Sequence, residues 1–152
     1  MNKKFHPVAS WLLCGMACIG LSAQAQDPIG YVKTVSGDAW VSTASQKVKA
    51  QPGTAVAIGS QLKTAPNGSM GVTFKDNTVM SFGPDTELTV DEYLYAPAQG
   101  KLKLGTRLGQ GSLNYVSGVI AKLKPDAVSV KTPGGTIGVL GTQFVAKVDP
   151  TP

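Results

Sequence analysis

Residues 128–148 read VSVKTPGGTIGVLGTQFVAKV, in which short apolar runs are separated by Pro, Gly and Thr. Val, Ile, Thr and Phe favour strands. Pro133 fixes φ, and Gly134 and Gly135 accept positive φ, so the segment after the first run favours a turn. The stretch therefore predicts strand, turn, strand, glycine, strand. It holds no acidic residue, His or Cys, which assigns it to the fold rather than to chemistry.

The same rhythm extends toward the N-terminus. Turn-forming pairs such as Pro52-Gly53 and Asp76-Asn77 recur at short, fairly even intervals. Between them polar and apolar residues alternate, as in Glu87–Asp91 and Lys101–Leu104, and this alternation is typical of half-buried strands. The sequence predicts an all-β domain of short strands in a solenoid-like or sandwich-like stack, with a small barrel also compatible. Helical spacing of apolar residues allows at most one short helix near 117–123.

The alternation also predicts which side chains form the core. We expect it to contain the large apolar residues of the inner strand faces: Trp40, Phe74, Met80, Phe82, Leu88, Leu113, Val130, Ile137, Val139 and Phe144. The last strand of the opening stretch would then close the core. On that basis Gly141→Val or Phe144→Ala is expected to lower the free energy of unfolding by about 2–5 kcal/mol.

The first 25 residues differ from the rest. A basic start is followed by an apolar run over residues 8–23 and by the small-x-small pattern Ala23-Gln24-Ala25. This order predicts a secretory signal peptide, residues 1–25, cleaved near Ala25 to leave a single domain over 26–149 in the periplasm or outside the cell. The apolar run is shorter than the roughly 20 residues of a spanning helix, so no membrane span is expected after cleavage, although an uncleaved anchor is the alternative.

Cleavage would remove both cysteines, Cys14 and Cys18, and the single histidine, His6. Each cysteine matches a lipoprotein site only in part. The favoured interpretation is that both serve as small apolar residues of the signal peptide, and lipidation at Cys18 is the alternative. Without Cys or His, the remaining chain cannot form a disulfide, a typical zinc or copper site, or a nucleophile–His pair. No catalytic residue, cofactor or metal is predicted.

The charge of the predicted mature chain is mild. Of the 14 basic residues, Lys3 and Lys4 leave with the signal peptide, so 12 basic residues face 9 acidic ones. Arg107 is the only arginine, and the lysines are spread along the chain. Nucleic-acid binders usually concentrate basic residues and use Arg for bidentate contacts. A nucleic-acid partner is therefore not expected.

Four acidic residues lie close together in the sequence: Asp85, Glu87, Asp91 and Glu92. Several carboxylates can bind Ca²⁺, and a pair of them can hydrolyse a glycoside. Their extended spacing and the lack of a glycine-centred loop favour a solvated strand face instead.

Tyr93-Leu94-Tyr95 places two tyrosines on one strand face. An exposed pair would suggest a binding patch, but packing with hydroxyls near solvent is the favoured interpretation. The lysine pairs at 101 and 103 and at 122 and 124 are interpreted as solvent-facing, with attraction to anionic envelope polymers as the alternative.

Three stretches together resemble a FecR domain, an extracytoplasmic family named after the iron-dicitrate regulator. They are PGTAVAIGSQLKT at 52–64, VTFKDNTVMSFGPDTEL at 72–88, and Thr132-Pro133 followed by GVLGTQF at 138–144. The last is similar to the family's Thr-Pro … Val-Arg-Gly-Thr-x-Phe signature. The resemblance covers roughly residues 29–148. Asn77 stands where Gly is usual, and Leu140 stands where the family usually has Arg.

The resemblance implies an all-β fold outside the cytoplasm and gives a set of motif positions with structural roles: Gly59, Thr64, Asp76, Asn77, Gly83, Pro84, Thr132, Pro133, Gly141, Thr142 and Phe144. The best-known members carry a cytoplasmic anti-sigma segment before a membrane helix. Only a few residues precede the apolar run here, so contact with a sigma factor is not expected.

The sequence therefore favours a non-enzymatic, exported binding or signalling module of the bacterial cell envelope. Its partner would be an envelope protein or a polysaccharide, and strand addition at a sheet edge is a plausible mechanism. The alternative is a structural scaffold that self-associates through strand edges. A weak enzyme acting on envelope polysaccharide through Asp85 and Glu87 is a third hypothesis.

Overall fold

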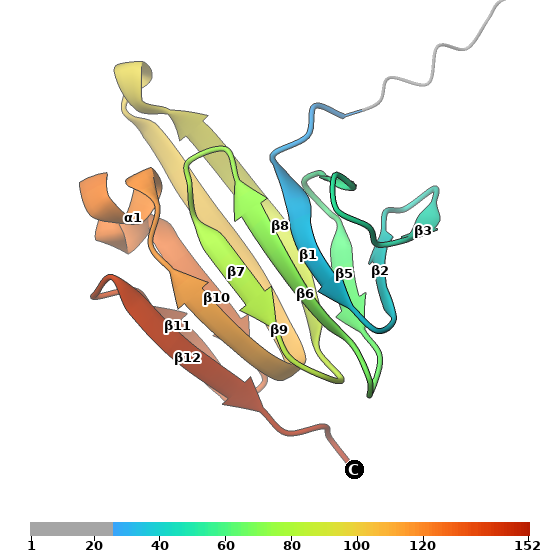
Figure 1. The fold of residues 1–152 in the computed structure, drawn as a ribbon. Coiled ribbons are helices and arrows are strands. Elements are labelled where there is room, and N and C mark those ends of the chain that lie inside the picture. Colours follow the sequence, from blue (N-terminus) through green and yellow to red (C-terminus); the bar gives the residue numbers. More distant parts are fainter. Residues whose placement is uncertain (1–25) are drawn as a thin grey trace, which may run out of the picture.

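The computed structural model of the protein describes residues 26–152, and these form an all-β domain with one short α-helix (Figure 1). This confirms the predicted fold class. The strands are β1 (Gly30–Ser36), β2 (Ala39–Ser42), β3 (Lys47–Lys49), β4 (Ala55–Val56), β5 (Gln61–Thr64), β6 (Ser69–Phe74), β7 (Val79–Phe82), β8 (Glu87–Ala96), β9 (Lys101–Val116), β10 (Val128–Thr132), β11 (Gly135–Gly138) and β12 (Gln143–Val148). The helical segments are η1 (Pro97–Gln99), α1 (Val119–Leu123) and η2 (Pro125–Ala127). The single α-helix lies within the range that the apolar spacing predicted.

The strands form one 12-stranded sheet organised around β9, which is 16 residues long. The first part of β9 pairs with β8 on one side and, in parallel, with β10 on the other. Its last part pairs antiparallel with β7 and with β12. Two groups of strands therefore share β9, and the sheet curls into a half-barrel around the core (Figure 1).

Glycine allows the turn from one part of β9 to the other. Gly111 has φ +89°, a conformation that side chains disfavour, and a Cβ there would overlap Thr86. The Thr86 hydroxyl accepts a hydrogen bond from the Ser112 N–H at 3.0 Å and donates to the Gly83 carbonyl at 2.8 Å. The β7–β8 corner is therefore fastened to β9 where the two strand groups meet.

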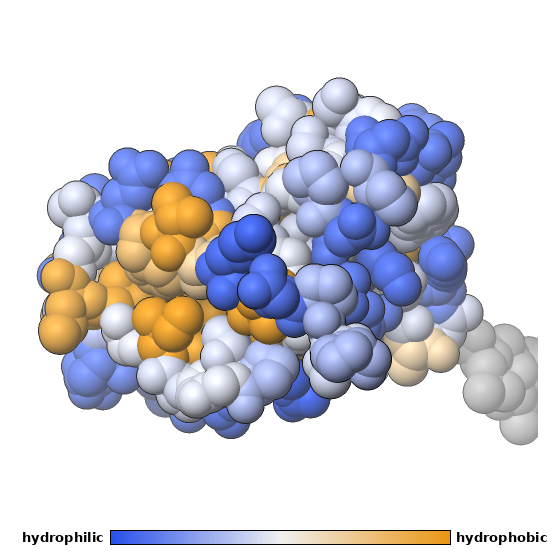
Figure 2. All heavy atoms as spheres, turned by 90° about the horizontal axis from the view of Figure 1, so that it is seen from below, coloured by the Kyte–Doolittle hydropathy of each residue, from blue (hydrophilic) through white to orange (hydrophobic). Residues whose placement is uncertain are grey.

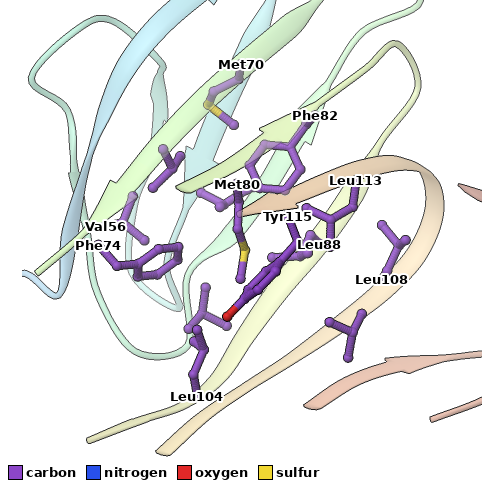
Figure 3. Close-up of a cluster of buried hydrophobic side chains, with 14 of the residues drawn as sticks. Val56, Met70, Phe74, Met80, Phe82, Leu88, Leu104, Leu108, Leu113 and Tyr115 are labelled. Carbon is purple, nitrogen blue, oxygen red and sulfur yellow. The ribbon is translucent and has the colours of Figure 1, made fainter. Parts of the chain in front are cut away.

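The core lies between the two strand groups. Figure 3 shows part of it, with side chains from β6, β7 and β9 pointing into one space. Seven of the ten predicted core residues are buried: Phe74, Met80, Phe82, Leu88, Leu113, Val130 and Val139. Ile137 and Phe144 are half-buried and pack against its edge.

The prediction for Trp40 was wrong. Ala39 and Val41 take the buried positions of β2, so the alternation of the strand puts Trp40 on the other face, half-exposed. There the Lys47 ammonium lies 5.1 Å from the centroid of the indole, which is cation–π geometry. The size and apolar character of Trp40 did not show which face of the strand is buried.

The predicted signal peptide, residues 1–25, lies outside the described residues, as do Cys14 and Cys18. Within residues 26–152, no helix has both the length and the apolar character needed to cross a bilayer.

Candidate functional site

A buried carboxylate holds α1 against the sheet. Asp76 lies in the β6–β7 turn with no solvent exposure. One of its oxygens accepts hydrogen bonds from the Tyr93 hydroxyl at 3.1 Å and the Thr78 N–H at 3.3 Å. The other accepts from the Thr78 hydroxyl at 2.7 Å and from the Ile120 N–H at 3.2 Å, within the first turn of α1. These four donors satisfy a charge that would otherwise be costly to bury.

The Asp76 backbone extends this connection. Its carbonyl accepts a hydrogen bond from the Val119 N–H at 2.7 Å, and its N–H donates to the Tyr93 hydroxyl at 3.0 Å. Burial, and then the nearby Asp76 carboxylate, raise the pKa of Tyr93, so the phenol stays protonated and can donate. The turn therefore fixes the start of α1 and joins it to β8.

Gly118, immediately before α1, allows the close approach. A Cβ at this position would overlap the Thr78 nitrogen and the Asp76 carbonyl oxygen and would lie 2.7 Å from the Asn77 carbonyl carbon. All three atoms belong to backbone, which cannot rotate away as a side chain can. The sequence did not single out Gly118, because no local pattern shows that two backbone segments approach each other there.

The loop between β11 and β12 forms one wall of a cleft, and it is tied to Ser117, just before α1. Ser117 donates from its hydroxyl to the Gly141 carbonyl at 2.7 Å, and its N–H donates to the Thr142 carbonyl at 2.8 Å. The loop between β11 and β12 is thus fixed opposite α1 and η2. The space between them is a cleft of about 380 Å³ lined by Ser117, Ala121, Lys122, Pro125, Leu140, Gly141 and Thr142.

Apolar side chains are exposed around this cleft. Leu140 is 97% exposed, and Leu123, the last residue of α1, is also exposed. Val116 of β9 and Val145 of β12 are exposed on two strands that pair with each other. Figure 2 shows apolar surface gathered on the left of the view, the side where Figure 1 has α1, β11 and β12. Contiguous apolar surface on a folded domain usually marks a site of interaction.

The cleft lies at one end of an open sheet edge. Four described strands, β3, β4, β11 and β12, pair with a neighbour on one side only, and β12 is the longest of them with six residues. Backbone groups in an antiparallel ladder alternate in direction. Because Ser117 bonds to Thr142, the backbone groups of Gln143, Val145 and Lys147 face away from β9. They are available to a further strand.

The cleft has a basic border. Residues 117–148 contain four lysines and one aspartate. Lys122 lines the cleft and Lys124 follows α1, and neither has a carboxylate within 4.0 Å among residues 26–152. A partner that carries negative charge would therefore be favoured over a basic one.

Three of the four clustered acidic residues contact basic or amide side chains. Asp91 lies 3.2 Å from Arg107, Glu92 lies 3.2 Å from Lys103, and Glu87 accepts a hydrogen bond from Gln61 at 2.6 Å. Asp85 is exposed in the turn before β8. Within the described residues, no group of three or more acidic, His or Cys side chains could hold an ion. This geometry fits a solvated strand face.

A second, smaller hollow of about 230 Å³ lies over these ion pairs. Gly105 leaves space between Glu92 of β8 and Ser129 of β10, and Arg107 and Lys131 border it. Neither Asp85 nor Glu87 lines either hollow, so the two carboxylates proposed for glycoside hydrolysis share neither hollow.

The two tyrosines of Tyr93-Leu94-Tyr95 pack against the core. Tyr93 is buried and stacks on Phe74 with ring centroids 5.7 Å apart, and Tyr95 is half-buried against the core. The two do share one strand face, as predicted. The packing interpretation fits, and an exposed tyrosine patch does not.

The predicted motif positions divide into two sets. The first set forms corners and buried contacts. Thr64 is buried, donates to the Gly83 carbonyl at 2.6 Å and accepts from the Thr86 N–H at 2.9 Å. Gly59 and Asn77 have positive φ, and Pro84 lies in the exposed β7–β8 turn. Asn77 thus adopts the conformation that Gly would supply in relatives.

The second set belongs to the opening stretch. The Thr132 hydroxyl donates to the Gly135 carbonyl at 2.9 Å across the turn that contains Pro133. Phe144 stacks on Tyr115 with ring centroids 4.9 Å apart. Gly141 and Thr142 are exposed and line the cleft.

The expectation for Gly141→Val is not supported by this structure. Gly141 does not have positive φ, and nothing lies within 4 Å of the position where its Cβ would be. A side chain there meets open space rather than strained backbone. This part of the opening stretch therefore borders the cleft instead of closing the core.

Comparison with known proteins agrees with the motifs. No curated protein and no solved structure matches the chain. The family described as FecR protein matches residues 60–152, which includes β5 to β12 and every part of the cleft. Strands β1 to β4, and most of the 52–64 stretch, lie before the matched region. By this match over more than half of its length, the chain belongs to the FecR protein family.

Proposed function

We propose that this protein is an exported, non-enzymatic binding module of the bacterial cell envelope that recruits a protein partner by strand addition. In this mechanism an extended partner segment pairs with β12 through backbone hydrogen bonds, and its side chains provide specificity. Signalling would follow from the presence or absence of the partner.

The observation that carries this proposal is the open edge of β12, which ends at the cleft that the signature residues Gly141 and Thr142 help to line. Edge strands are usually protected by shortness, charge or proline. The edges at β3 and β4 are three and two residues long, and β3 carries Lys47 and Lys49. β12 has six residues and an exposed Val145 at its centre.

The location rests on the sequence and on the family. The N-terminal 25 residues have the order of a signal peptide, and the resemblance to FecR domains implies a place outside the cytoplasm. A domain without Cys needs no disulfide to fold there.

The proposal is tested by capturing the partner from cells that produce the protein. Tagged protein is crosslinked in intact cells, recovered, and compared with two variants at one position. Val145→Pro removes an N–H that faces the open edge, and edge positions tolerate proline because the β9 ladder does not use that donor. Val145→Thr keeps the N–H and the β-branched shape of the side chain.

We expect one envelope protein to be captured by the unmodified protein and by Val145→Thr, and to be lost with Val145→Pro. Capture of the same protein by all three forms would show that binding does not use the β12 edge. Sedimentation at high concentration tests self-association, and a stable monomer would exclude the scaffold alternative.

A further inference from the structure

We infer that the cleft beside β12 takes a large apolar side chain from an extended, acidic partner segment. This inference rests on the proposed strand addition and adds the chemistry of the partner. Backbone pairing at the edge would be the same for any extended chain, so the cleft would determine which side chain is preferred.

Continuity between the edge and the cleft is the first argument. Gln143 is the first residue of β12, and its backbone groups face the open edge. The two residues before it, Gly141 and Thr142, line the cleft. A strand advances about 3.4 Å per residue, so a partner reaches the cleft within two or three residues of Gln143. An antiparallel partner would place its C-terminal end there.

The size and lining of the cleft give the second argument. Its volume is about 380 Å³, and its walls include Ala121, Pro125 and Leu140. An apolar cavity of about 150 Å³ is enough to hold benzene. One aromatic or branched aliphatic side chain therefore fits with space remaining. Leu140 is 97% exposed in the free protein, so covering it also removes apolar surface from water.

The charge around the cleft decides between a second copy and a different partner. Lys122 is at the cleft wall and Lys124 is at the end of α1, and neither has an acidic partner within 4.0 Å among residues 26–152. A two-fold contact through this surface would bring the lysines of both copies together. Carboxylates next to the apolar side chain of another chain would instead pair with them.

The test uses synthetic peptides as probes. The first has the order Thr-Val-Thr-Val-Thr-Glu-Phe-Glu, with an edge-pairing segment followed by the proposed anchor. Two matched peptides replace Phe by Ala or both Glu by Lys, and a fourth has the reversed order to allow parallel pairing. Dissociation constants are measured by fluorescence anisotropy with the purified protein, and the contact surface is mapped from backbone amide shifts in NMR spectra.

We expect the Phe peptide to bind at least about tenfold more tightly than the Ala peptide, since the anchor buries a large apolar side chain. It should shift the amide signals of residues 117–124 and 140–142. Lys122→Glu in the protein should weaken the Phe peptide and strengthen the Lys peptide. Leu140→Ser should weaken only peptides that contain Phe. Lys75→Glu and Leu94→Ser, exposed changes outside the cleft lining, serve as controls and should leave affinity unchanged.

Three results would overturn the inference. Equal affinity of the Phe and Ala peptides, with binding of both lost in Val145→Pro, would leave strand addition intact and remove the role of the cleft. A Phe peptide that shifts no signal of the cleft at millimolar concentration, in either order, would do the same. A dimer that Leu140→Ser dissociates would replace the acidic partner with a second copy.

Discussion

At the residue scale, Asp76 is the clearest single determinant of the structure. Both carboxylate oxygens accept from backbone N–H groups, one from Thr78 and the other from Ile120. An asparagine could present its carbonyl to only one of them and would turn its NH₂ group toward the other donor. The position therefore requires two acceptors, which a carboxylate supplies and an amide does not.

We expect Asp76→Asn to lower the free energy of unfolding by about 2–4 kcal/mol, because a buried donor is left without an acceptor and the Tyr93 and Thr78 hydroxyls must reorient. Urea denaturation followed by circular dichroism measures the change. Asp85→Asn, in an exposed turn with φ +51°, is the matched control and should change stability by less than about 0.5 kcal/mol. Equal effects of the two substitutions would contradict the role of Asp76.

Gly118 offers a test of the close approach before α1. It is the N-cap residue of the helix and has an extended backbone, so the preference for alanine inside helices does not apply, and the N-cap position itself favours glycine over alanine. A Cβ at this position would overlap the backbone of the Asp76–Thr78 turn. We therefore expect thermal melts of Gly118→Ala to show a clear loss of stability. Gly141→Ala, where the Cβ meets open space, should melt with the unmodified protein.

Tyr93 gives the protein a predictable response to alkali. Burial and the Asp76 carboxylate raise its pKa above the ordinary value of 10.0, so the unfolded chain releases this proton at a lower pH than the folded one. The contribution of Tyr93 to the free energy of unfolding is fully present below about pH 10. It is lost as pH rises toward the pKa of the folded state, by up to about 1.4 kcal/mol per pH unit.

Tyr93→Phe removes both the hydrogen bonds of the hydroxyl and this titration. The variant should be less stable than the unmodified protein at neutral pH, and the difference should shrink as pH rises above 10. Urea denaturation at several pH values from 8 to 11 measures this trend. Tyr31→Phe, at an exposed position on β1, is the control. A difference for Tyr93→Phe that stays constant over the whole range would show that the proton is not retained on folding.

At the element scale, the strands of residues 128–148 were predictable, while their roles were not. Alternation and turn chemistry predicted β10, the turn at Pro133, β11 and β12 in order. The same residues did not show that β11 and β12 pair with different neighbours, because this depends on the length and the bend of β9. Local patterns therefore predicted the elements but not the edge that β12 leaves open.

The candidate site was hidden from the sequence for a related reason. Ser117 and Gly141 meet by a hydrogen bond between residues 24 positions apart, and Asp76 reaches Ile120 over 44 positions. No periodicity encodes such contacts. The useful signal was Leu140, which departs from the family pattern and lies exposed at the cleft.

Attachment of β12 to the core should depend on Phe144. Its ring stacks on the buried Tyr115, but it is only half-buried, so Phe144→Ala should cost about 2 kcal/mol, near the lower end of the range for large-to-small changes. Hydrogen exchange should also become faster along β12 than along β6. Val145→Ala, on the exposed face of the same strand, is the control and should leave both measurements unchanged.

At the scale of the whole molecule, the proposed function requires that the domain reach the envelope. The basic start, the apolar run and Ala23-Gln24-Ala25 predict cleavage after Ala25. N-terminal sequencing of protein recovered from the periplasm is therefore expected to begin at Gln26. Ala25→Lys should block processing, because a small residue is needed before the cleaved bond, while Gln26→Ser should leave it unchanged. Protein that remains in the cytoplasm with Met1 in place would contradict export, and a lipid-modified N-terminus at Cys18 would replace cleavage after Ala25 with anchoring to the membrane.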